Sequence, residues 1–241
     1  MKNLVLTSII CIFSIINGIK ASETVETAVA SDEKIVSEKE VIDPCERFSA
    51  IKPQLNFRSS YGELAYNHDY DQENLDILSE QGTTKEEGMF TAGLSLLDVD
   101  WSVSLNTITR EVGEHTCVIP ASLDVFLGYR NPVIYISSDI EEGTCEYKLI
   151  KRHEQQHQQI NVSVLEHYLP TIKKAFEDEL SVLKARVIDG EKTLDDITDE
   201  MNSDYVFEVR PIVNRFQITL QLEHKHLDTR DNYEYESNLC K

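Results

Sequence analysis

Residues 149–168 read LIKRHEQQHQQINVSVLEHY, and this stretch decides which fold class the sequence predicts. Apolar residues and two histidines recur at three- and four-residue spacing, which predicts an amphipathic helix with one core-facing side. Within it, His153-Glu154-Gln155-Gln156-His157 has the form H-E-x-x-H. Because helical residues four apart project from the same face, His153 and His157 can bind one metal ion together.

The sequence around this stretch is also helical in pattern. Thr144 is a suitable N-cap for the helix. Pro170 is expected to bend or restart the chain, and a second helix should continue until Asp189-Gly190. Helical spacing resumes at Val206, although β-branched residues there allow a strand instead. Pro211 would be tolerated only near the start of that last helix.

The first half of the chain has the pattern of a sheet. The expected elements are an extended segment at 54–67, a short helix at 71–80, and strands at 96–109, 117–126 and 132–137. Within the strand at 96–109, apolar and polar residues alternate from Leu97 to Leu105, and Gly128-Tyr129-Arg130-Asn131 is expected to join the last two strands. We therefore expect an α+β fold, in which an N-terminal, mainly antiparallel sheet precedes the H-E-x-x-H helix and further C-terminal helices.

The first 43 residues are not expected to belong to the folded domain. Lys2 precedes an apolar run and Ala21-Ser22 offers a cleavage point, so residues 1–21 have the layout of a secretory signal peptide. An uncleaved anchor is the alternative, although the run is short for a membrane span. Residues 22–43 are acidic and lack aromatic residues, which predicts a disordered leader or a propeptide. Residues 44–241 are enough for one domain with a sizeable core.

The chain is strongly acidic, with 43 Asp and Glu against 23 Lys and Arg and a formal net charge of −20 at pH 7. Such a surface repels nucleic acids and anionic lipids, which argues against both as partners. No second apolar segment is long enough to cross a bilayer, so no stable membrane insertion is expected after signal removal. The sequence therefore predicts a secreted or periplasmic protein.

Four cysteines lie outside the expected signal peptide: Cys45, Cys117, Cys145 and Cys240. An even number of cysteines in an exported chain predicts two disulfides. Three pairings are open. Because Cys45 and Cys240 bracket the domain, we favour a disulfide between these two.

The H-E-x-x-H spacing implies a mechanism. His153 and His157 would each bind Zn²⁺ through one nitrogen, a third residue would complete the site, and water would fill the fourth position. Zinc lowers the pKa of bound water from about 15.7 toward about 7 and polarises a scissile carbonyl. Glu154 would take the proton of that water as general base and pass it to the leaving amine. Two core histidines that match the motif by chance are the alternative.

The third ligand does not follow directly from the motif. Glu166 would project from the opposite side of the helix, and His167 would lie about 15 Å further along its axis. On the last expected helix, His224 continues the apolar stripe, His226 projects elsewhere, and Asp228 lies one turn beyond His224. His224 is therefore our first choice and Asp228 our second, with a capping or solvated role as the alternative for each.

Several segments share their order with a known family. They are Asp71-x-Glu73-Asn74-Leu75, the strand region around Trp101, Leu123-Asp124-Val125, the H-E-x-x-H helix and Leu227-Asp228-Thr229. Over most of Phe57 to Asp228 the chain thus resembles a bacterial family of predicted secreted zinc-dependent proteases. The resemblance implies a zincin-like α+β fold, export, and a zinc-peptidase-like domain at 44–241. The family's closing turn continues with His-Gly, where this chain has Arg230-Asp231, so the resemblance leaves the third ligand open.

Three functions follow from these observations. The first is a secreted or periplasmic zinc metallopeptidase that hydrolyses peptide bonds in a peptide or protein substrate. The second is a catalytically silent exported domain that keeps the fold and binds a metal or a protein. The third is a disulfide-braced structural protein whose motif arose by chance.

Overall fold

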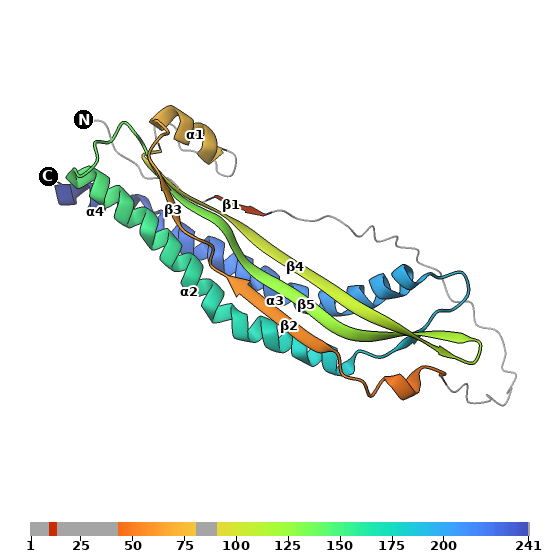
Figure 1. The fold of residues 1–241 in the computed structure, drawn as a ribbon. Helices are drawn as coiled ribbons and strands as arrows, with labels where there is room; N and C mark the ends of the chain where they lie inside the picture. The colour runs from red at the N-terminus through yellow and green to blue at the C-terminus, as the bar shows by residue number, and fades with distance from the viewer. Residues whose placement is uncertain (1–9, 14–42, 81–90, 241) are drawn as a thin grey trace, which may run out of the picture.

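The computed structural model describes residues 10–13, 43–80 and 91–240. The strands are β1 (Ile10–Phe13), β2 (Gln54–Ser60), β3 (Ala65–Asn67), β4 (Gly93–Val112), β5 (His115–Ile136) and β6 (Arg186–Val187). The helices are α1 (Gln72–Glu80), α2 (Cys145–Val182), α3 (Leu194–Leu227) and α4 (Arg230–Ser237), with 3-10 helices η1 (Glu46–Phe48) and η2 (Asn238–Cys240). The long hairpin β4–β5 and the long helices α2 and α3 run side by side in an elongated molecule (Figure 1). This is an α+β fold, as the sequence predicted.

The sheet is mixed, in the order β1-β4-β5-β2, with β3 and β6 also paired to β5. The central hairpin β4–β5 and the β5–β6 pair are antiparallel, whereas β1, β2 and β3 each lie parallel to their neighbour. The mainly antiparallel sheet expected from the sequence is therefore not confirmed. Side-chain alternation gives the period of a strand, but it does not give the direction of the neighbouring strand.

β5 is one continuous strand, so the expected break at 128–131 is wrong. Gly128 serves close packing against β2, because a Cβ added there would lie 2.3 Å from the carbonyl oxygen of Ser60. Asn131 has a positive φ of 49°. It lies where the β4–β5 register shifts between Leu96 and Asp98. Both residues are typical of turns, but here Gly128 allows two strands to approach closely and Asn131 lies in a β-bulge.

Both long helices continue through a proline, which the sequence reading did not expect. α2 contains Pro170, and α3 contains Pro211 well inside the helix. α3 also begins earlier than expected, at a capping box between Thr193 and Asp196. The expected second helix does not reach Val187, which instead belongs to β6. Burial of a long apolar stripe on each helix outweighs the hydrogen bond that a proline removes.

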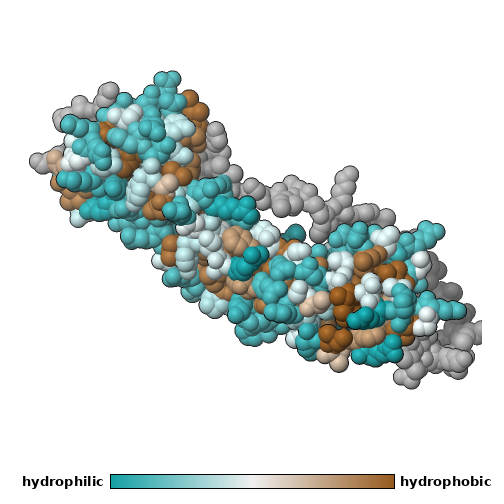
Figure 2. Space-filling view, viewed as in Figure 1, coloured by the Kyte–Doolittle hydropathy of each residue, from teal (hydrophilic) through white to brown (hydrophobic). Residues whose placement is uncertain are grey.

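The main core lies between the sheet and the two long helices. Leu97, Val99 and Leu105 of β4 are buried in it, and Phe176 of α2 and Phe216 of α3 are fully buried. Hydrophilic side chains cover most of the face that Figure 2 shows, in keeping with the high net charge. No helix among residues 43–80 and 91–240 is long and apolar enough to cross a membrane.

Two disulfides join Cys45 to Cys117 and Cys145 to Cys240. The favoured pairing of Cys45 with Cys240 is therefore wrong. These two residues lie near opposite ends of the elongated molecule, beside η1 and in η2 respectively (Figure 1). Most of the expected signal peptide (1–21) and nearly all of the expected leader (22–43) lie outside the described residues, although 10–13 forms β1.

We expect Gly128→Ala to lower the free energy of unfolding by about 3 kcal/mol, because the new Cβ would meet the β2 backbone and force the strands apart. Gly113→Ala is the matched control. It has a φ of +64° and open space around it, so it should cost only about 1 kcal/mol of left-handed strain. Urea unfolding with both disulfides intact measures both values, and equal losses would contradict the close approach at Gly128.

Candidate metal centre

The first half of α2 carries the H-E-x-x-H motif on its buried side. Thr144 is its N-cap, as predicted, and accepts a hydrogen bond from the backbone N–H of Tyr147. His153, Glu154 and His157 are all fully buried. The prediction that both histidines face the core is confirmed, and the motif does not lie on a solvated surface.

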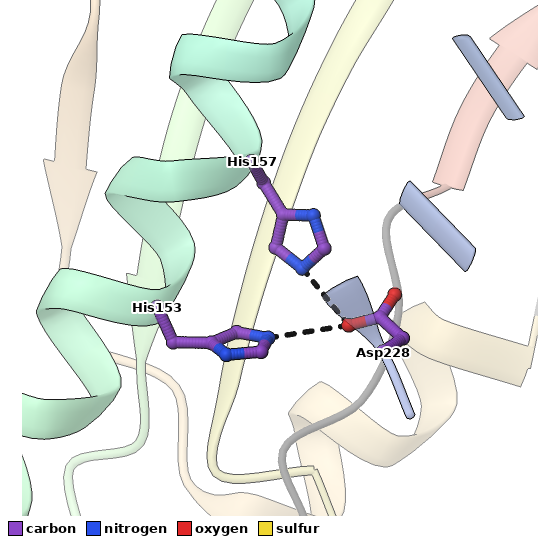
Figure 3. A group of neighbouring side chains, drawn as sticks. All are labelled: His153, His157 and Asp228. Carbon is purple, nitrogen blue, oxygen red and sulfur yellow. Dashed lines mark hydrogen bonds and ion pairs between the residues drawn. The ribbon is translucent and has the colours of Figure 1, made fainter. Parts of the chain in front are cut away.

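Asp228, the C-cap of α3, brings its carboxylate to both histidines (Figure 3). Its Oδ1 lies 3.2 Å from Nε2 of His153 and 3.0 Å from Nε2 of His157. The three residues form a group that could hold a metal ion, with one ligand atom from each lying within 4.8 Å of the others. Ligand atoms of a tetrahedral zinc ion lie about 3.3 Å apart, so the 3.2 Å and 3.0 Å that separate Oδ1 of Asp228 from the two nitrogens suit a shared ion.

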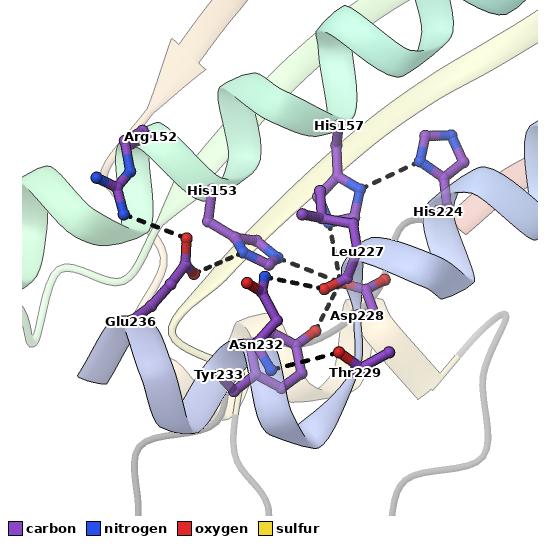
Figure 4. Close-up of polar contacts among 10 residues, drawn as sticks. All are labelled: Arg152, His153, His157, His224, Leu227, Asp228, Thr229, Asn232, Tyr233 and Glu236. Carbon is purple, nitrogen blue, oxygen red and sulfur yellow. Dashed lines mark hydrogen bonds and ion pairs between the residues drawn. The ribbon is translucent and has the colours of Figure 1, made fainter. Parts of the chain in front are cut away.

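His224, the first choice for the third ligand, lies outside this group although it is buried as the stripe predicted. Its Nδ1 is 3.1 Å from Nδ1 of His157, and its Nε2 is 2.9 Å from Oδ1 of Asn161 (Figure 4). It therefore contacts His157 on the ring nitrogen that faces away from Asp228. His226 is exposed, as expected.

A chain of hydrogen bonds determines which nitrogen of His157 carries a proton. The side-chain amide of Asn161 donates to Gln158, so its Oδ1 accepts and His224 must donate from Nε2. Burial and the neighbouring His157 lower the pKa of His224 to about 3, so its ring is neutral and its Nδ1 accepts. His157 therefore donates from Nδ1. Its own pKa is also lowered, mainly by burial, so its ring is neutral too.

This leaves the lone pair of His157 on Nε2, the nitrogen nearest Asp228. Nε2 has no hydrogen-bond partner and lies 3.0 Å from Oδ1 of Asp228. Burial alone would raise the pKa of Asp228, but the hydrogen bonds that it accepts from His153 and Tyr233 help to hold it below its usual range, so the carboxylate is ionised. A lone pair and an ionised oxygen repel each other at this distance unless a cation lies between them. The arrangement therefore has the electrostatics of a cation site.

His153 has a carboxylate at each ring nitrogen. Nδ1 lies 2.9 Å from Oε2 of Glu236, and Nε2 faces Asp228. Burial acts to lower the pKa of His153, but the hydrogen bonds to Asp228 and Glu236 outweigh it and raise the pKa to about 9. Arg152 contacts the other oxygen of Glu236 at 3.3 Å. A metal at Nε2 would replace a proton there, while Glu236 would keep the ring oriented through Nδ1–H.

Glu154 is buried beside this group, and neither of its carboxylate oxygens has a hydrogen-bond partner. Gly93 of β4 makes room for it, since a Cβ there would lie 2.8 Å from Oε1 of Glu154. Burial raises the pKa of Glu154 to about 8, with His153 opposing the shift and Asp228 adding to it. An unpartnered buried carboxyl group with a pKa near neutrality is suited to general acid–base chemistry.

Sequence reasoning missed the contribution of α4. Tyr233 donates from its hydroxyl to Oδ1 of Asp228 at 2.6 Å, and Glu236 orients His153 (Figure 4). Thr229 caps this helix by accepting from the backbone N–H of Asn232, which sets the turn directly after Asp228. Most of α4 is polar, so it has no apolar stripe. The one available signal is the three-residue spacing of Tyr233 and Glu236, which are its buried residues.

Comparison with protein-family models, with curated proteins and with solved structures gives no match. The family resemblance read from the sequence therefore stays a prediction. The geometry itself shows a group of His153, His157 and Asp228 that could hold a metal ion.

We expect Asp228→Ala to weaken metal binding more than His224→Ala does, with Zn²⁺ as the probe and chelator competition as the measurement. Loss of His224 removes only a hydrogen-bond partner of His157, which should cost about 10–100-fold in affinity. His226→Ala is the control and should bind as the unaltered chain does, because His226 is exposed. A larger loss for His224→Ala would make His224 the third ligand instead.

The disulfide between Cys145 and Cys240 should support the metal centre, because it ties η2, and with it α4, to the first turn of α2. We expect the double variant Cys145→Ser/Cys240→Ser to bind Zn²⁺ about 10–100-fold more weakly, as when oriented partners of ligands are lost. Cys45→Ser/Cys117→Ser is the matched control, since it removes the disulfide at the other end of the molecule. Equal losses of affinity in the two variants would point to general destabilisation.

Proposed function

We propose that this chain is a secreted or periplasmic zinc-dependent hydrolase of peptide bonds. His153, His157 and Asp228 would be the zinc ligands, and Glu154 the general base. The observation that carries the proposal is the buried group of His153, His157 and Asp228, in which Oδ1 of Asp228 lies 3.2 Å from Nε2 of His153 and 3.0 Å from Nε2 of His157. A divalent cation among these atoms would satisfy the Nε2 lone pair and the carboxylate together, and a second buried carboxyl group, that of Glu154, lies beside them.

The donor set supports zinc. Two imidazoles and one carboxylate are a usual ligand set of catalytic zinc, which keeps its fourth position for water or substrate. Glu236 at Nδ1 of His153 completes the carboxylate–histidine–metal arrangement that is common at such sites. The H-E-x-x-H helix beneath a sheet supports a zincin-like arrangement, and two disulfides are typical of proteins from an oxidising compartment.

The chain's own residues would divide the work of hydrolysis. The zinc ion, when bound, would polarise the scissile carbonyl and lower the pKa of water. Glu154 would take the proton from the attacking water and give it to the leaving amine. Burial suits Glu154 to both steps, because it keeps the pKa of the carboxyl group near neutrality. Tyr233 would hold the ligand oxygen of Asp228 in place through its short hydrogen bond.

A catalytically silent metal-binding domain is the second candidate, and burial favours it. His153, Glu154 and His157 are fully buried, and the side chain of Asp228 is only 7% exposed. A site enclosed to this degree can hold a metal ion for stability or for binding without admitting a substrate.

Metal analysis and peptide hydrolysis together test the proposal. We expect about one zinc ion per chain. Hydrolysis of a peptide library should fall about 10²–10⁴-fold in Glu154→Gln, the range of general-base contributions, while zinc stays bound. Glu166→Gln is the control, because Glu166 is an exposed glutamate of the same helix and should leave hydrolysis unchanged.

Each other outcome is also informative. Equal turnover by Glu154→Gln and the unaltered chain would remove Glu154 as the base. Bound zinc without hydrolysis of any library peptide would favour the silent domain. Absence of bound metal after purification and zinc dialysis would overturn the metal centre itself.

A further inference from the structure

Helix α3 carries apolar residues on the side that faces away from the core as well as on its buried side. Phe216 is fully buried on the core side, whereas Phe207, Ile218 and Leu222 are 73%, 55% and 50% exposed. Pro211 lies between them and is also exposed. At 3.6 residues per turn, the four exposed residues lie within roughly 60° of one another about the helix axis. They form one stripe, which we call the outer stripe of α3.

The outer stripe is exposed to an unusual degree for this chain. No other large apolar side chain of the described residues is as exposed as Phe207. Apolar residues scattered singly over a surface need no partner, but a contiguous row along one helix face is typical of a surface that binds another protein.

The spacing of the outer stripe is the same from either end. Phe207 and Pro211 are four residues apart at one end, and Ile218 and Leu222 are four apart at the other. An antiparallel copy of α3 therefore places Phe207 opposite Leu222 and Pro211 opposite Ile218, twice over, about a two-fold axis beside Asn214. A symmetric dimer interface requires a surface that is complementary to itself in this way.

The charges around the outer stripe are balanced, although those of the whole chain are not. The full chain has a formal net charge of −20, so most faces of two copies would repel each other. From residue 204 to residue 225, α3 has three acidic and three basic side chains, and all are exposed: Asp204, Glu208, Arg210, Arg215, Glu223 and Lys225. Two copies can therefore approach along this face without a net repulsion between the charges of the two helices.

Opposite charges also meet at the two ends of the antiparallel arrangement. The same register that pairs Phe207 with Leu222 places Asp204 of one copy opposite Lys225 of the other. Asp204 contacts Arg186 of its own chain, yet its side chain remains 59% exposed, so it can accept a second cation. A parallel arrangement would instead bring like charges together at each end, so the charges favour the antiparallel one.

We propose that this chain forms a symmetric homodimer in which the outer stripes of two α3 helices pack against each other in antiparallel orientation. A contact between two helix faces is small, on the order of 1,000 Å² in total, which places the dissociation constant at roughly 1–100 µM. The occupant of the stripe is therefore a second copy of the same chain.

The dimer does not rest on the proposed hydrolase function. His224 projects from the buried side of α3, and Asp228 ends the helix about 20 Å from the two-fold axis at 1.5 Å per residue. Each copy therefore keeps its own candidate metal centre, and the two centres lie roughly 40 Å apart along the paired helices.

Sedimentation velocity of the exported chain, with both disulfides formed, tests the dimer between about 1 and 200 µM. The native chain should pass from one copy to two over this range. Phe207→Glu loses its contact twice in a symmetric dimer and should weaken association at least about 100-fold. Leu194→Glu is the control, since Leu194 is a 39% exposed residue of the same helix outside the stripe. A single copy at every concentration, or equal dissociation constants for both variants, would overturn the dimer.

An exchange of charges tests the register. Lys225→Asp places like charges opposite each other at both ends and should weaken association about tenfold. Asp204→Lys/Lys225→Asp should restore the dissociation constant to within about threefold of the native value. Glu223→Lys/Lys225→Asp is the matched control, because it keeps the same total charge but leaves two aspartates opposite each other. Equal affinities in the two double variants would overturn the antiparallel register.

A cysteine beside the two-fold axis tests the symmetry directly. The four cysteines of residues 43–240 are paired, so an added cysteine is a free thiol. Asn214→Cys should form a disulfide with its own copy under mild oxidation, since the two thiols lie next to the axis. Gln221→Cys is the control, because its two copies lie about 20 Å apart along the paired helices. Equal cross-linking by both variants, or cross-linking by Gln221→Cys alone, would overturn the proposed axis.

Zinc content and peptide hydrolysis, measured on the same samples, separate this inference from the proposed function. Phe207→Glu should take up zinc as the native chain does, because Phe207 lies on the outer side of α3. A dimer that takes up no zinc would support the interface and overturn the hydrolase. Zinc binding and hydrolysis by a chain that stays single at every concentration would do the reverse.

Discussion

The carboxylate of Asp228, held between two imidazole nitrogens, is the interaction on which the buried centre depends. It joins α2 to the end of α3, and the hydroxyl of Tyr233 joins the same oxygen to α4. An ionised carboxylate in the interior needs positive charge close by. His153 supplies that charge as long as it is protonated, whereas His157 cannot, because its proton is directed to His224. In the metal-free centre, the proton on Nε2 of His153 is thus the positive charge that faces Asp228. A divalent cation in its place would bind Nε2 of both histidines.

The neighbouring charges fit such an exchange. Glu236 is balanced by Arg152 at the surface side, so its interaction with His153 does not need a second cation. Replacing one proton on His153 by a divalent ion would add one net positive charge beside Glu154. That charge opposes the effect of burial, which holds the pKa of Glu154 at about 8, and would favour its ionised form. In the proposed hydrolase, metal binding and the ionisation of Glu154 would therefore be coupled through a single buried cluster.

The sequence predicted the parts of this arrangement that depend on local periodicity. The alternation along β4 and the buried face with both histidines follow from the spacing of apolar residues, and the N-cap follows from the capping preference of Thr144. It could not predict features that depend on a distant neighbour. In the sequence Gly128 is typical of a turn, and only the fold shows that it allows the backbone of Ser60 to approach. The disulfide partners depend on which end of the molecule each cysteine reaches. α4 could not be predicted from periodicity, because its two buried side chains, Tyr233 and Glu236, do not form an apolar stripe.

The ranking of His224 over Asp228 shows where helical-wheel reasoning fails. Asp228 is the C-cap of α3, with φ −83° and ψ 43°, so it has left the helical path and its side chain does not follow the helical phase. A wheel drawn through that residue assigns it the wrong direction. His224 keeps the phase and is buried as predicted, but burial on the correct face places it behind His157 instead of beside Asp228. Residues at helix ends can therefore reach positions that no residue on the regular stripe can reach, and here the carboxylate that meets both histidines comes from such an end.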